Sequence, residues 1–135
     1  MDDRKKMLTG SPSRDRFKQA HKELSGRFYA CDLDFILVEK YPPHIAAILD
    51  FKLPGDKVTF AEVIAYNDLL GHYPIFIVTA SDPENGPYEI EQYLGGDYRP
   101  FPPIVHLVHI TTCKDLAEFG EWEAAIRKDL YKGTN

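Results

Sequence analysis

The stretch DLDFILVEKYPPHIAAILDFK, residues 32–52, holds two short apolar runs separated by the turn sequence YPPH. Runs of this length that are rich in β-branched residues predict two antiparallel strands joined by a short turn. Side chains alternate between the two faces of a strand. We therefore expect Asp50 and Lys52 to project to one face of the second strand, and Leu49 and Phe51 to the other.

One carboxylate lies at the start of the first predicted strand and another at the end of the second, and these two ends are adjacent in an antiparallel hairpin. Asp34 precedes Asp50 by 16 residues, so a tight hairpin brings the two side chains close together. Two converging carboxylates offer the oxygen ligands that Mg²⁺ and Mn²⁺ prefer. Lys52 would lie within reach of a metal-bound water, which a lysine can orient or deprotonate. The residue set suits phosphodiester cleavage, and Asp32, on the same face as Asp34, could supplement the metal ligands.

The same stretch resembles the PD-(D/E)XK nuclease superfamily, in particular small prophage- and mobile-element-type members. That family uses an Asp followed by (D/E)-x-K on the next strand, and Asp34, Asp50 and Lys52 match this pattern. Leu33 stands where the family name has proline. The resemblance covers roughly residues 28–93.

The resemblance implies a fold, a cofactor and a set of roles. The implied fold is α/β, a restriction-endonuclease-like mixed β-sheet flanked by α-helices. The implied cofactor is Mg²⁺ or Mn²⁺, held by Asp34 and Asp50 with Asp32 as a further ligand. Asp34, Asp50 and Lys52 would be catalytic, and the partner would be nucleic acid, most of all DNA.

Other interpretations of these residues stay open. The three aspartates and Lys52 could be polar residues at strand ends that form surface salt bridges, although acidic residues are disfavoured within strands. A catalytically silent nucleic-acid-binding or regulatory protein could keep the same fold. A metal-free module that binds a protein partner through its aromatic surface is a further alternative.

Length and composition describe a globular chain. Its 135 residues suffice for one domain with a real core, and hydrophobic residues make up 44% of them. No apolar run approaches the ~20 residues of a membrane span, and the polar start has no signal-peptide core. We expect a cytoplasmic protein. Cys31 and Cys113 lack C-x-x-C spacing, which favours buried free thiols.

Charge is distributed unevenly along the chain. Residues 1–27 carry a net charge of +4, and the rest carries −9. This asymmetry predicts that Arg14, Arg16 and Lys18 contact phosphates, although solvated charges would give the same pattern. We expect a flexible tail over residues 1–12 and a single nuclease-like domain over 13–135, with a helix that Ser13 caps. A homodimer is compatible with this pattern, and the oligomeric state stays open.

The remaining elements follow from local signals. Thr59 and Glu62 form a T-x-x-E capping box for a helix through Leu70, and an apolar strand follows over residues 74–80. Two more strands, over residues 88–93 and 104–110, and a final helix capped by Thr112 and Asp115 complete the chain. Glu62 and Tyr66 faintly resemble a Q-x-x-x-Y motif of some superfamily exonucleases, but the capping box already explains Glu62. Glu23 is a further candidate metal ligand or an exposed helix charge.

Overall fold

The structure, a computed structural model, describes residues 12–22 and 34–133. The chain divides into two units, Met1–Ala30 and Cys31–Asn135. The described part of the first unit is helix α2 (Pro12–Lys22). Ser13 was predicted to be the N-cap of this helix. Because α2 begins at Pro12, Ser13 instead lies inside its first turn. Glu23, Cys31 and Asp32 lie outside the described residues, and the expected boundary at residue 13 stays a prediction.

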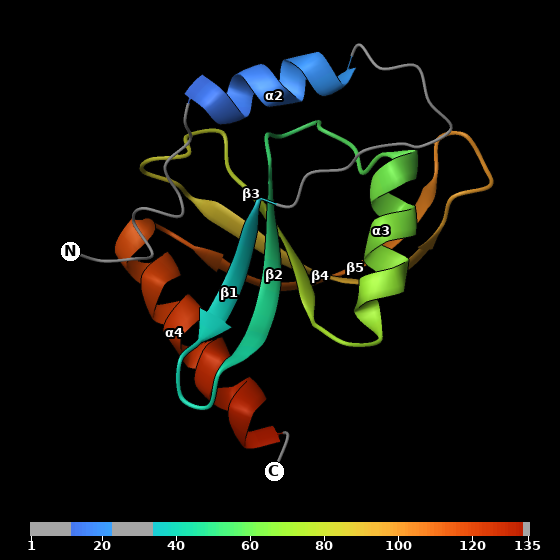
Figure 1. The fold of residues 1–135 in the computed structure, drawn as a ribbon. Helices are drawn as coiled ribbons and strands as arrows, with labels where there is room; N and C mark the ends of the chain where they lie inside the picture. Colours follow the sequence, from blue (N-terminus) through green and yellow to red (C-terminus); the bar gives the residue numbers. More distant parts are fainter. Residues whose placement is uncertain (1–11, 23–33, 134–135) are drawn as a thin grey trace. The chain divides into compact units, whose positions relative to one another are not determined.

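A five-stranded mixed sheet forms the centre of the second unit (Figure 1). Its strands lie side by side in sequence order: β1 (Phe35–Glu39), β2 (His44–Lys52), β3 (Ile75–Thr79), β4 (Tyr88–Asp97) and β5 (Ile104–Cys113). Strands β2 and β3 are parallel, and the other neighbours are antiparallel. Parallel neighbours need a crossover, which helix α3 (Phe60–Leu70) supplies. The predicted mixed α/β class is confirmed.

Helices α3 and α4 (Leu116–Gly133) lie on opposite sides of the sheet (Figure 1). Apolar side chains on one sheet face, Leu49 and Phe76 among them, pack with Phe119 and Trp122 of α4. On the other face, residues such as Ile77 pack with α3. Covering both faces explains why β3 is a continuous apolar run. Each residue of β2 therefore faces one helix or the other.

The β1–β2 register decides which face Asp34 shares. Phe35 pairs with Leu49, so Asp34, the residue before β1, comes opposite Asp50. Nearer the turn, Leu37 pairs with Ala47 but Val38 pairs with Ile45. Ala46 is therefore an extra residue in β2, a β-bulge that shifts the register by one. A one-residue shift moves a side chain to the other face of a sheet. Without this bulge, Asp34 would share the face of Leu49 rather than that of Asp50.

Strands β4 and β5 are longer than the sequence predicted. Strand β4 continues to Asp97 through Gly95, where the predicted loop began. Gly95 has φ +127°, a conformation that favours glycine and lets the strand continue past a register shift. Strand β5 reaches Cys113, so Thr112 is a strand residue. Asp115 caps α4, and its Oδ1 accepts a hydrogen bond from the Glu118 N–H at 2.9 Å.

Asn67 fixes α3 against β4. Its Oδ1 accepts hydrogen bonds from the Tyr93 hydroxyl at 2.6 Å and the Gly96 N–H at 3.2 Å. Its Nδ2 donates to the Gly96 carbonyl at 3.0 Å. The predicted Thr59–Glu62 capping box is present at the start of the helix. These contacts set the rotation and height of α3, and hence the direction of every side chain that it presents to the sheet.

Gly96→Ala is expected to destabilise the fold by about 1–3 kcal/mol, because overpacking forces backbone shifts. A Cβ at this position would lie 2.7 Å from the Ile104 carbonyl oxygen and 2.9 Å from the Tyr93 hydroxyl oxygen. Urea unfolding measures the loss. The matched control is Gly120→Ala in α4, where a Cβ meets nothing within 4 Å and helix propensity predicts a gain of about 0.5–1 kcal/mol. Equal responses of the two variants would contradict the proposed close approach.

No helix within residues 12–22 and 34–133 is both long and apolar enough to cross a membrane. The buried Cys113 is a free thiol, as predicted. Burial raises the pKa of this thiol above its ordinary value, which makes it a poor nucleophile at neutral pH.

Candidate active site

The structure brings Asp34, Asp50 and Lys52 together, as the hairpin predicted. The Asp34 Oδ2 accepts a hydrogen bond from the Phe51 N–H at 2.8 Å, which fixes Asp34 against β2. Asp50 is 3% exposed, and the Asp34 carboxyl lies close enough to raise the pKa of Asp50. The Lys52 Nζ lies 3.9 Å from the Asp50 Oδ2. The convergence is confirmed, and the catalytic roles of these residues stay predictions.

Helix α3 adds Glu62 and Tyr66 to this cluster. The Lys52 Nζ donates to both carboxylate oxygens of Glu62, at 2.8 and 2.7 Å. The Tyr66 hydroxyl donates to the Asp50 Oδ2, and it lies 3.4 Å from the Glu62 Oε2. Tyr66 is fully buried. The five residues, Asp34, Asp50, Lys52, Glu62 and Tyr66, are called the acidic–lysine cluster below.

Sequence reasoning assigned neither Glu62 nor Tyr66 to the site. The signal was their spacing of four residues, which places two side chains on the same side of a helix. The capping box already explained Glu62, but its carboxylate both caps the helix and binds Lys52. Its Oε1 accepts from the Thr59 N–H at 2.9 Å as well as from Lys52.

Asp50 is the most strongly perturbed acid of the cluster. Burial and the neighbouring Asp34 carboxyl raise its pKa to about 8, against the opposing influence of Lys52. The physical cause is that ionising both carboxyls would place two negative charges side by side in a poorly solvated site. At neutral pH, Asp50 therefore keeps its proton when no cation is present.

Glu62 behaves in the opposite way. Burial alone would raise its pKa, but hydrogen bonds from Lys52 and from the Thr59 N–H outweigh burial and lower the pKa below its ordinary value. Glu62 is therefore a carboxylate at neutral pH. It holds Lys52 in one position beside the aspartate pair.

The aspartate pair fits a divalent cation. The Asp34 and Asp50 carboxyls lie close together, and a cation between them would replace the proton on Asp50 and offset their repulsion. Mg²⁺ typically takes one or two protein carboxylates and keeps water or phosphate oxygens at its other positions. Across the described ranges, no group of three or more His, Cys, Asp or Glu side chains is arranged to hold a metal. Asp32, the third predicted ligand, lies outside those ranges.

The predicted phosphate-binding residues Arg14, Arg16 and Lys18 all fall within α2. Arg16 is exposed, and its guanidinium donates to the Ser13 hydroxyl at 3.2 Å. The side chains at positions 14 and 18 lie outside the description. The role of this helix in nucleic-acid binding stays a prediction.

Glu62→Gln is expected to lower the free energy of unfolding by about 1–3 kcal/mol, since it removes a hydrogen bond to a charged group at a partly buried site. The amide can still accept from the Thr59 N–H, so the helix cap survives. Urea unfolding at neutral pH measures the change. Asp97→Asn serves as the control, because it weakens the Asp97–Arg99 pair, whose guanidinium is exposed, and surface pairs of this kind contribute about 0–1 kcal/mol. A Glu62→Gln protein as stable as the control would mean that the Lys52 pairing contributes nothing.

The acidic–lysine cluster thus gathers side chains from the start of β1, the end of β2 and the first turns of α3 on one face of the sheet. Its residues could hold a divalent cation between two carboxyls and place an amine beside that cation. Comparison with known proteins finds no family model, no curated protein and no solved structure that matches the chain.

Proposed function

We propose that this chain is a divalent-metal-dependent nuclease that hydrolyses phosphodiester bonds of DNA, on a restriction-endonuclease-like fold. The observation that carries the proposal is the meeting of Asp34 and Asp50 across a hairpin, with Lys52 on the same sheet face. The order of β1, β2, crossover helix α3 and parallel β3 agrees with the core that the sequence resemblance implies.

Each residue of the acidic–lysine cluster has a role in the proposed reaction. Asp34 and Asp50 would hold Mg²⁺ or Mn²⁺, which supplies charge neutralisation of the phosphate and a lowered pKa of bound water. Lys52 orients the attacking water and offsets negative charge that develops on the phosphate oxygens. The attacking water gives up one proton to solvent as its oxygen forms a bond to phosphorus, the bond from phosphorus to the leaving oxygen breaks, and the leaving oxygen takes up one proton from solvent.

Glu62 and Tyr66 are positioning residues in this scheme. Glu62 receives two hydrogen bonds from the Lys52 amine, so it keeps the amine beside Asp50 rather than in solvent. The Tyr66 hydroxyl donates to one oxygen of Asp50, and the proposed cation would take the other oxygen. Preorganised side chains of this kind lower the cost of reaching the productive geometry.

A catalytically silent nucleic-acid-binding protein on the same fold is the second candidate. One observation favours it: the Lys52 amine is engaged by both Glu62 oxygens, as in a structural ion pair. On that hypothesis the cluster serves stability, and neither metal nor cleavage is required.

The test is incubation with labelled DNA and RNA in single-stranded, duplex and branched forms, in Mg²⁺, Mn²⁺ or EDTA. Cleavage of at least one DNA form in Mg²⁺ or Mn²⁺, and none in EDTA, is the expected result. Binding without cleavage of any form, at every metal concentration, would favour the silent protein instead.

The basic N-terminal segment should make DNA binding fall steeply with salt, because its residues release counterions from the phosphates they contact. Deleting residues 1–12 and changing Arg14, Arg16 and Lys18 to Gln should lower affinity and reduce the slope of log Kd against log salt. Each lost phosphate contact should reduce that slope by about 0.7–0.9. Fluorescence anisotropy in a salt series measures it. An unchanged slope would mean that these charges are only solvated.

A further inference from the structure

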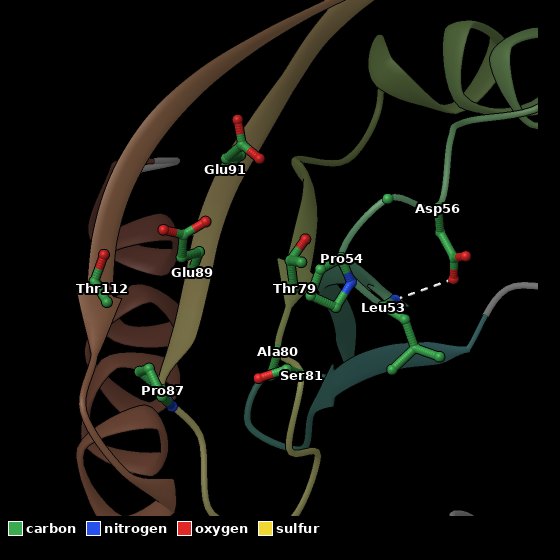
Figure 2. Close-up of a pocket in the computed structure, with 11 residues that line it drawn as sticks. Leu53, Pro54, Asp56, Thr79, Ala80, Ser81, Pro87, Glu89, Glu91 and Thr112 are labelled. Atoms are coloured by element: carbon green, nitrogen blue, oxygen red, sulfur yellow. Dashed lines mark hydrogen bonds between the residues drawn. The ribbon is translucent and has the colours of Figure 1, made fainter.

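A hollow of about 540 Å³ is lined by the loop that follows Lys52 and by residues of β3, β4 and β5. Figure 2 shows Glu89 and Glu91 of β4 on the same wall as Thr79 of β3, with the loop that contains Leu53 and Pro54 beside them. Loop and strands together form an open pocket. Its volume lies in the range of sites that hold small molecules or single nucleotides.

Sheet register connects this hollow to the acidic–lysine cluster. Thr79 pairs with Lys52 on one side and with Glu89 on the other, and Ile77 likewise pairs with Asp50 and Glu91. Directly paired residues of neighbouring strands share a face. Strands are spaced by ~4.8 Å, so the two glutamates stand about 10 Å across the sheet from Lys52 and Asp50. The hollow therefore lies on the same sheet face as the candidate active site.

The lining of the hollow accepts hydrogen bonds. Among the residues that the structure describes, the lining contains the carboxylates of Asp56, Glu89 and Glu91 and the hydroxyls of Thr79, Ser81 and Thr112, but no Lys, Arg or His. Neither glutamate side chain makes a hydrogen bond or ion pair within the part of the chain that the structure describes. Such a lining repels a phosphate group. It suits a group that donates N–H bonds and carries no negative charge.

A nucleobase has that chemistry. Cytosine and adenine present an amino group, and glutamate is a known acceptor for the cytosine amino group. Pro54 and Pro87 add apolar surface for the ring. In a duplex the base edge is paired and the ring is stacked, so only an unpaired base can enter a pocket.

We propose that this hollow receives an unpaired nucleobase of the strand whose phosphate lies at Lys52, so that the substrate is single-stranded DNA or an unpaired segment of a larger DNA. The proposal rests on the proposed nuclease function for the phosphate position. Cytosine and adenine should be favoured over thymine, because the thymine edge carries two carbonyl oxygens that face the carboxylates unfavourably.

The experiment uses labelled single-stranded oligonucleotides of mixed sequence, with cytosine or thymine at each position around the cut site, and a matched duplex. Cleavage in Mn²⁺ and binding in EDTA are both measured. Single strands should be cut faster than the duplex, and cytosine should exceed thymine about tenfold at one position. The double variant Glu89→Gln with Glu91→Gln should lose most of this preference. Glu121→Gln, an exposed change on α4, should keep it.

The outcomes separate the pocket from the nuclease. Equal cleavage of duplex and single strands, or a preference that the double variant retains, overturns the base pocket and leaves the nuclease standing. If the double variant changes only the Mn²⁺ concentration needed for cleavage, the base pocket is also overturned, because the glutamates would then bind a cation. Absence of cleavage, together with base-dependent binding that the double variant loses, supports the pocket and overturns the nuclease.

Discussion

Asp50→Asn and Lys52→Ala are both expected to abolish DNA cleavage while changing metal affinity in opposite directions. Asp50→Asn removes a charged ligand, so Mn²⁺ affinity should fall by about tenfold or more, since even outer-shell changes cost 10- to 100-fold. Lys52→Ala removes a positive charge from beside the cation, so Mn²⁺ should bind as well or better. Loss of the water-positioning amine should slow cleavage by about 10²–10⁴-fold.

The Asp50→Asn substitution is not expected to destabilise the metal-free fold. Because the pKa of Asp50 is raised to about 8, the side chain is already neutral at pH 7 without metal. Asparagine copies the size of the neutral acid and can still accept from the Tyr66 hydroxyl. We therefore expect the unfolding free energy in EDTA to be equal to or above that of the unchanged protein. Lost activity would then report chemistry rather than misfolding.

Lys52→Ala is expected to affect fold stability as well as activity, because the amine also neutralises the Glu62 carboxylate. Removing it leaves the Glu62 carboxylate at a partly buried site without its cationic partner, although the Thr59 N–H and the Tyr66 hydroxyl remain near it. Some stability should be lost, and Lys52→Met, which keeps the length of the side chain, controls for packing. Calorimetry with Mn²⁺ and single-turnover cleavage separate metal binding from rate.

A structural salt bridge predicts a different result. If both variants lose stability alike, bind Mn²⁺ as the unchanged protein does, and the unchanged protein cuts no nucleic acid, then Asp50 and Lys52 are structural partners. That combination would establish the catalytically silent candidate. The opposite shifts in metal affinity are therefore the decisive measurement.

The hairpin could be predicted from sequence because its signals are local. Apolar runs on either side of two prolines define the strands, and the alternation of side chains assigns Asp50 and Lys52 to one face. The face of Asp34 is different. It depends on the extra residue Ala46, and no local signal marks a bulge at an alanine in an apolar run.

The contributions of α3 required information that sequence alone does not hold. A carboxylate with a local explanation, such as Glu62 in its capping box, can also make a long-range contact. Whether it does so depends on how the helix is rotated against the sheet. That rotation is set by Asn67, Tyr93 and Gly96, which come together only in the folded chain.

The two strands that were predicted too short illustrate the same limit. Glycines and prolines in residues 95–103 indicate a loop, and such residues usually interrupt strands. Here Gly95 and Gly96 instead form the end of β4, because pairing with β5 satisfies their backbone groups. Tertiary pairing overrode the local preference. The paired strands then supply Glu89, Glu91 and Thr112 to the hollow described above.

The stability of the metal-free protein is expected to fall as pH rises from about 5 to 8 because of Asp50. The ordinary pKa of this carboxyl is 3.8, and the folded protein raises it to about 8. Between these values the folded state keeps a proton that the unfolded state has lost. Raising the pH therefore favours unfolding, by up to about 1.4 kcal/mol per pH unit. Above pH 8 both states are ionised, and this contribution becomes constant.

Urea unfolding in EDTA at half-unit steps from pH 5 to 9 measures this dependence, and Asp50→Asn supplies the comparison. The difference in unfolding free energy between the variant and the unchanged protein should grow with pH up to about 8 and then level off, since asparagine cannot ionise. Saturating Mn²⁺ should abolish the decrease of the unfolding free energy with pH, because a cation stabilises the ionised pair and binds only the folded state. A difference that stays flat over the whole range would mean that Asp50 is ionised at neutral pH, and the aspartate pair would then lack the mutual repulsion that a cation relieves.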